Sequence, residues 1–139
     1  MVIDLKDILF RYPARLLGTV LCLVALHSFL IGLALITQPV FLMKAAGFGP
    51  GGYHFFPAQG GVFHILMAVM YLTGAVDIKK YHYFIVFAIV VKAAATLFLM
   101  LYFFVVDYKW IILLSGISDF AMGLMIYMAL RNYLNSNVI

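Results

Sequence analysis

Four long apolar stretches, separated by short polar segments, dominate the chain. They cover about residues 16–36, 58–76, 83–105 and 110–130, and each is close to the roughly 20 residues with which an α-helix crosses a bilayer. The connections DIKKYH and DYKW are so short that the last three of these helices are expected to form antiparallel hairpins. The pattern therefore predicts an all-α fold, an integral membrane four-helix bundle that forms one transmembrane domain over residues 1–139.

The remaining segments are short or glycine-rich. MVIDLKDILFRYPAR alternates apolar and charged positions in a way that suits a short N-terminal helix in the membrane interface, ended by Pro13. The connection from Thr37 to Pro57 is the long one, and its glycines predict a loop. The first span is too long for the apolar region of a signal peptide, so we expect it to be retained.

Composition supports the membrane assignment, because 67% of the residues are hydrophobic, 10% are charged and the mean hydropathy is +1.14. The net charge of +4 comes mostly from basic residues beside the spans. Basic residues in these positions indicate the orientation of the helices in the membrane, and we predict no nucleic-acid partner. Cys22, the single cysteine, is interpreted as a packing residue.

The distribution of basic residues predicts the orientation of the bundle. One side holds Lys44 and Lys109, and the other side holds a larger basic set: Lys6, Arg11, Arg15, Lys79, Lys80 and Arg131. Because the more basic side faces the cytoplasm, both termini are expected there, and the setting that fits is a bacterial cytoplasmic (inner) membrane.

Two charged residues lie inside predicted spans. Asp119 is about ten residues from the outer end of the fourth span, and Lys92 is about ten residues from the inner end of the third, which places both near mid-membrane at about 1.5 Å per residue. A lone charge there would cost at least about 2.5–3.5 kcal/mol, so the two side chains are expected to meet inside the bundle. They form either an ion pair or a neutral acid beside a neutral amine. Their role is either structural, fixing the helix register, or functional, in ligand or proton handling.

Further polar side chains extend this prediction to a ligand-binding pocket. One face of the second predicted helix could line a pocket that opens toward the glycine-rich loop, and its residues are Gln59, Phe63, His64, Met67 and Tyr71. The predicted ligand-binding residues are Gln59, His64, Lys92 and Asp119, with His27 and His54 in a second layer. An alternative is that the histidines only hydrogen-bond between helices.

Catalytic and metal-binding patterns are missing from the sequence. It has no HExxH, no CxxC, no nucleophile elbow and no GxxxxGK[ST] loop. We therefore predict neither catalytic residues nor a metal site, and an enzymatic role is disfavoured but left open.

Two segments carry a family resemblance. RLLGTVLCLVALHSFLIGLALITQPVFLMKAAGFGP is an arginine-led span followed by a proline and a segment with methionine and glycine, and GGVFHILMAVMYLTGAVD begins with paired glycines. Together they resemble the first half of DoxX-like small membrane proteins. The resemblance implies a four-helix membrane bundle, in some members attached to quinone-reducing complexes, and it supplies no catalytic residues.

These observations favour an accessory or binding protein over an enzyme. Its pocket would accept a quinone-like or lipid-like molecule, or the bundle would dock on a larger membrane complex. One alternative is a redox subunit in which His27 and His64 ligate a b-type haem. Another is a proton-coupled small transporter. Because such transporters are usually larger and built from repeats, this chain would have to act as a homo-oligomer.

Overall fold

Helices account for almost all of the computed structural model, which describes residues 12–48 and 54–136. Over these residues it contains α2 (Pro13–Thr37), α3 (Val40–Ala45), α4 (Phe55–Val76), α5 (His82–Val105) and α6 (Trp110–Ser136), and no strand. All except α3 are long and apolar enough to cross a membrane. The predicted all-α four-helix membrane bundle is thus confirmed, while the predicted N-terminal interfacial helix lies outside the described residues.

Proline and polar residues explain where the helix ends differ from the predicted spans. Pro13 stands in the first turn of α2 and Pro57 in the first turn of α4, where a missing backbone N–H costs no helical hydrogen bond. Both helices therefore start earlier than the apolar runs do. α6 ends later than predicted, because it continues through Arg131 to Ser136. A helix can extend beyond the hydrocarbon core, whereas the apolar pattern marks only the part inside it.

The connection between Thr37 and Pro57 is not simply the predicted loop, because it contains α3. Gln38 ends α2 with a left-handed φ of 44°, and the apolar hexapeptide that follows Pro39 folds into one short helix. Gly47, with φ of 85°, ends that helix. The Gly47 N–H donates to the Lys44 carbonyl and the Phe48 N–H to the Met43 carbonyl, at 3.0 and 2.9 Å, which is a Schellman motif.

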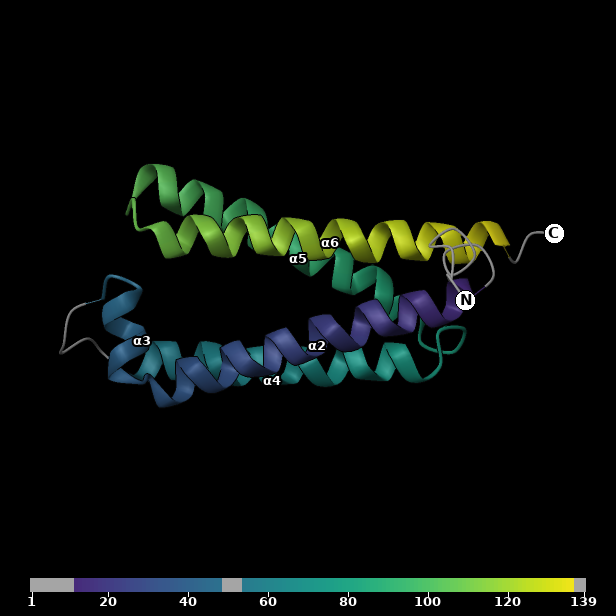
Figure 1. Ribbon diagram of the computed structural model, residues 1–139, viewed down its shortest axis with the longest axis horizontal. Coiled ribbons are helices and arrows are strands. Elements are labelled where there is room, and N and C mark those ends of the chain that lie inside the picture. Colours follow the sequence, from purple (N-terminus) through teal and green to yellow (C-terminus); the bar gives the residue numbers. More distant parts are fainter. Residues whose placement is uncertain (1–11, 49–53, 137–139) are drawn as a thin grey trace, which may run out of the picture.

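The long helices associate as two antiparallel pairs. Figure 1 shows α4 running alongside α2 and α6 alongside α5, while α5 crosses over to join the two pairs. α4 and α5 are joined by a short turn, as predicted, but they diverge from it and pack on each other much less than the partners within a pair do. The start of α2 and the end of α6 lie at the same end of the bundle.

The packed core lies at the end of the bundle where α2 begins. It gathers apolar side chains from all four long helices: Leu17, Leu21, Val24, Ala25, Ala68, Tyr71, Ile85, Ala88, Met122, Ile126, Ala129, Leu130 and Tyr133. In α5 the buried residues stop at Lys92, about halfway along the helix. Most other large apolar side chains are exposed, as a lipid-facing surface requires.

Candidate functional site

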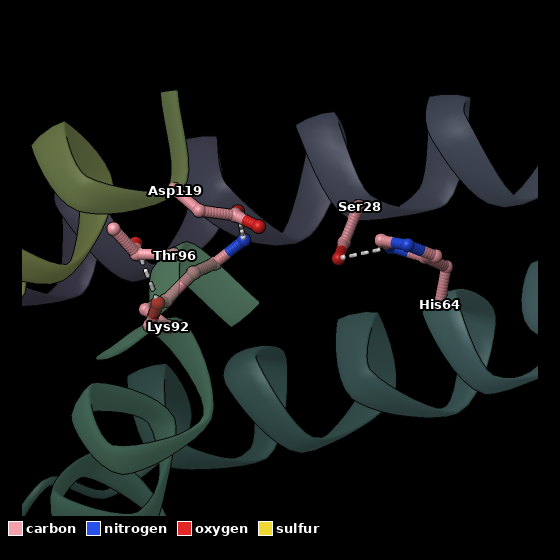
Figure 2. Close-up of polar contacts among 5 residues, drawn as sticks. All are labelled: Ser28, His64, Lys92, Thr96 and Asp119. Carbon is pink, nitrogen blue, oxygen red and sulfur yellow. Dashed lines mark hydrogen bonds and ion pairs between the residues drawn. The ribbon is translucent and has the colours of Figure 1, made fainter. Parts of the chain in front are cut away.

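A buried ion pair stands where the packed core ends. Lys92 Nζ of α5 lies 2.5 Å from Asp119 Oδ1 of α6, and only 4% and 12% of these side chains are exposed. Figure 2 shows the amine pointing at the carboxylate from the neighbouring helix. The predicted meeting of the two residues at equal depth is confirmed.

Small residues allow α5 and α6 to approach at this pair. A Cβ atom placed on Gly123 would lie 3.0 Å from Lys92 Cβ, so the glycine leaves room for the lysine stem. Ala88, one turn before Lys92, is fully buried. Thr96, one turn after it, donates a hydrogen bond of 2.8 Å from Oγ1 to the Lys92 carbonyl oxygen. Small side chains of α5 therefore stand one turn before and one turn after the lysine.

Tyr71 of α4 brings an aromatic ring to the pair. Its side chain is buried, and Lys92 Nζ lies 5.9 Å from the centroid of its ring, within the range of a cation–π contact. The sequence placed Tyr71 on the same face as His64, but its contact with Lys92 could not be inferred from that.

His64 of α4 makes an interhelical hydrogen bond, which is the alternative role predicted for the histidines. Its Nδ1 shares a hydrogen bond of 3.4 Å with the hydroxyl of Ser28, which is buried in α2 (Figure 2). We call Ser28, His64, Tyr71, Lys92 and Asp119 the polar cluster. All four long helices contribute to it.

Ser28 was missed by the sequence analysis. A serine in an apolar span is common and costs little, so the residue type alone carries no signal. Its burial against a histidine of the paired helix becomes visible only once the rotation of α2 about its axis is known.

Other predicted site residues lie apart from the ion pair. Gln59 is exposed on α4, toward the end where that helix begins. His54 pairs with Gln38 beyond the ends of α2 and α4: its Nδ1 lies 2.9 Å from Gln38 Oε1, and its carbonyl accepts from Gln38 Nε2 at 3.2 Å. The structure therefore joins Lys92 to Asp119 but does not gather Gln59 and His54 around them.

A small groove gives the ion pair access to the surface of the bundle. It has a volume of about 180 Å³ and lies between α5 and α6, lined by Ile89, Lys92, Ala93, Thr96, Asp119, Phe120, Gly123, Leu124 and Tyr127. Phe120, Leu124 and Tyr127 are exposed on the lipid-facing surface. The buried pair thus borders a groove that is open at the surface of the bundle.

The two histidines proposed as haem ligands take part in different contacts. His27 lines a separate groove of about 300 Å³ between α2 and α6, together with Ser118 and Met122, whereas His64 faces Ser28 across the α2–α4 contact. Over the described residues, no group of three or more His, Cys, Asp or Glu side chains could hold a metal ion. A bis-histidine haem needs only these two ligands, so the haem alternative stays a prediction.

No protein-family model, curated protein or solved structure matches the chain. The Lys92–Asp119 pair and the α5–α6 groove beside it are therefore the features that bear on function.

Proposed function

We propose that this chain is a small DoxX-like integral membrane protein that binds a quinone-like or lipid-like molecule in the α5–α6 groove. The observation that carries the proposal is the position of Lys92 and Asp119, a buried ion pair that also lines a groove open to lipid. Intramembrane ionisable residues that face a cavity commonly mark ligand or ion pathways.

The groove offers complementary chemistry to an amphiphile with a small polar head. Lys92 can donate a hydrogen bond to a carbonyl oxygen, and Asp119 can accept one from a hydroxyl group. Ile89, Phe120 and Leu124 supply apolar walls beside these groups. Because about 180 Å³ is less than the 300–1,000 Å³ typical of sites that enclose a whole ligand, the head would enter and the tail would stay in lipid.

The proposed setting is a bacterial cytoplasmic membrane with both termini in the cytoplasm. Among the described residues, the end where α2 begins carries four bases, Arg15, Lys79, Lys80 and Arg131, and the opposite end carries Lys44 and Lys109. The more basic end is expected to stay cytoplasmic. Protection of the C-terminal residues from protease in right-side-out vesicles would support this orientation, and their cleavage would contradict it.

Retention of a ligand through purification tests the binding proposal. The full chain is extracted in mild detergent, and the apolar molecules that stay bound are identified and quantified by mass spectrometry. We expect a quinone-like or lipid-like species in stoichiometric amount with the parent protein. A Soret band in the absorption spectrum of the same preparation would favour the haem alternative instead.

Two neighbouring alanines give a matched pair of variants. Ala93 lines the groove, whereas Ala94 is exposed and does not line it. We expect Ala93→Leu to fill the groove and lower retention about tenfold or more, which corresponds to at least about 1.4 kcal/mol, while Ala94→Leu retains the ligand. Equal retention by the two variants, or no retained molecule in the parent, would contradict the proposal.

A further inference from the structure

A third and larger groove lies at the end of the bundle where α2 begins. Its volume is about 740 Å³, and it is formed by the first half of α2, the end of α4, the turn between α4 and α5, and one residue of α6. The lining residues that matter here are Arg15, Gly18, Cys22, Val76, Asp77 and Lys79. This groove shares no residue with the α5–α6 groove, so its role is independent of the proposed function.

Two cationic side chains stand at the rim of this groove. Arg15 comes from the first turn of α2 and Lys79 from the α4–α5 turn, and both residues are exposed. The ion pairs formed by described residues are Lys92 with Asp119 and Lys109 with Asp107, so neither rim cation is neutralised there by a carboxylate.

Asp77 also lines the groove, but it has a structural partner. Its Oδ1 accepts a hydrogen bond of 3.0 Å from the backbone N–H of Lys80, which stabilises the α4–α5 turn. One carboxylate against two bases leaves the rim with a net positive charge. The rim therefore favours an anion.

The start of α2 adds to this positive potential. Its N-cap residue, Tyr12, makes no side-chain capping hydrogen bond, and its first turn contains no acidic residue. Helix N-termini attract anions because their first backbone N–H groups lack helical acceptors. Ala14 and Arg15, both in this first turn, line the groove.

Deeper in the membrane the same groove has apolar walls. Gly18, Cys22 and Leu23 follow one another along α2, and Ala75 and Val76 face them from the end of α4. Leu23 and Val76 are 62% and 84% exposed, so this wall continues into the lipid-facing surface. The groove thus combines a cationic rim at the membrane surface with an apolar channel that runs toward the membrane centre.

We propose that this groove is a binding site for an anionic phospholipid of the leaflet on the side where α2 begins. The phosphate would lie between Arg15 and Lys79, and one acyl chain would lie along Gly18 and Cys22. The groove of about 740 Å³ is wide open, so a lipid lying in it would keep part of its surface in contact with the bilayer. A soluble anion would leave the apolar wall unused, and a zwitterionic lipid would leave the rim charge uncompensated.

Native mass spectrometry of the full chain tests the site, with phosphatidylglycerol and phosphatidylcholine as the two probes. We expect the parent to bind phosphatidylglycerol more tightly than phosphatidylcholine. Each of Arg15→Gln and Lys79→Gln should lower the affinity for phosphatidylglycerol roughly fivefold, in line with the contribution of one basic residue at an anionic membrane surface. Arg131→Gln, which removes a base outside the groove at the same end of the bundle, should leave the affinity unchanged.

A steric variant tests the groove without changing charge. A Cβ atom on Gly18 would meet only the Ala75 carbonyl oxygen, at 3.8 Å, so Gly18→Ala is tolerated and Gly18→Leu projects a side chain into the groove. We expect Gly18→Leu to abolish the preference for phosphatidylglycerol and Gly18→Ala to keep it, with both variants melting at the temperature of the parent.

Several results would overturn the proposal. Equal weakening by Arg131→Gln would reveal a general charge effect, and an unchanged preference in Gly18→Leu would place the lipid elsewhere. Displacement of phosphatidylglycerol by inorganic phosphate would identify a site for soluble anions. Photocrosslinking of residues 1–11 to Cys22 in the presence of phosphatidylglycerol would show that the chain itself occupies the groove.

Discussion

Gly32 of α2 and Gly61 of α4 face each other so closely that neither position has room for a methyl group. A Cβ atom on Gly61 would lie 2.6 Å from the Gly32 carbonyl oxygen, and one on Gly32 would lie 2.8 Å from the Gly61 carbonyl oxygen. Ile65 Cγ1 and Ile36 Cγ1 are also within 2.8 Å of these added atoms, but the two carbonyl oxygens belong to the backbone and cannot rotate away. Small residues that let backbones approach are the usual basis of helix pairing in membranes, so this contact fixes the α2–α4 pair.

Substitution of Gly61 should therefore loosen that pair. We expect Gly61→Ala to lower the free energy of unfolding by about 1–3 kcal/mol, the cost of overpacking a close contact, as measured by thermal unfolding in detergent. Gly60→Ala is the matched control, because a Cβ atom on Gly60 would meet nothing within 4 Å. If the two variants melt at the same temperature, the close approach of the two backbones does not stabilise the bundle.

Removal of the Ser28 hydroxyl should have a small effect. The hydrogen bond of 3.4 Å to His64 is long, and interhelical hydrogen bonds in membrane proteins average only about 0.6 kcal/mol. We expect Ser28→Ala to lower the free energy of unfolding by about that amount. Ser28→Leu should lower it more, because Ser28 is only 1% exposed and has no space for a larger side chain. A loss above about 2 kcal/mol in Ser28→Ala would mean that this contact does more than join two helices.

The end of α3 depends on a left-handed glycine. Gly47 has φ of 85°, a conformation that costs a residue with a side chain roughly 1–2 kcal/mol. We expect Gly47→Ala to speed hydrogen exchange at the amides of Gly47 and Phe48 about five- to thirtyfold, because their hydrogen bonds close the Schellman motif. Gly47→Asn should show a smaller increase, since asparagine tolerates this conformation better. Parent-like exchange in Gly47→Ala would contradict this role.

The same glycine packs against the connection between α5 and α6. The Lys109 side chain lies against Gly47, with its Cδ atom 3.7 Å from the position of an added Cβ, and Lys109 Nζ lies 5.3 Å from the centroid of the Phe48 ring. We expect Lys109→Ala to raise exchange at Phe48 as well, while Lys44→Ala, which removes an exposed base of α3, does not. Equal behaviour of the two variants would show that Lys109 does not hold this segment.

The sequence was sufficient to predict the features that depend on height in the membrane. The pairing of Lys92 with Asp119 required only a rise of about 1.5 Å per residue and the antiparallel order of consecutive helices. Burial of a lone charge is so unfavourable that the two oppositely charged side chains were expected to pair. This part of the site was predictable for that reason.

Features that depend on rotation about a helix axis were not predictable. Gln59 lies five residues before His64, which is about 140° around the helix axis, and it stays exposed. His64 and Tyr71, seven residues apart, do share a helical face, yet His64 turns to Ser28 of α2 and Tyr71 to Lys92 of α5. Spacing along one helix does not determine which neighbour that face meets. The short turn between α4 and α5 likewise predicted their antiparallel order, but not that each would pack mainly on α2 or α6.

The buried pair is tested most directly by a double-mutant cycle on Lys92 and Asp119, read as the unfolding free energy of the detergent-solubilised bundle. Lys92→Met and Asp119→Leu should each lose about 3–5 kcal/mol, because each leaves one buried charge without its partner. The double variant should lose clearly less than the two single variants together, since it leaves no uncompensated charge. Parent-like melting of both single variants, or strictly additive losses, would show that the two residues do not stabilise each other inside the bundle.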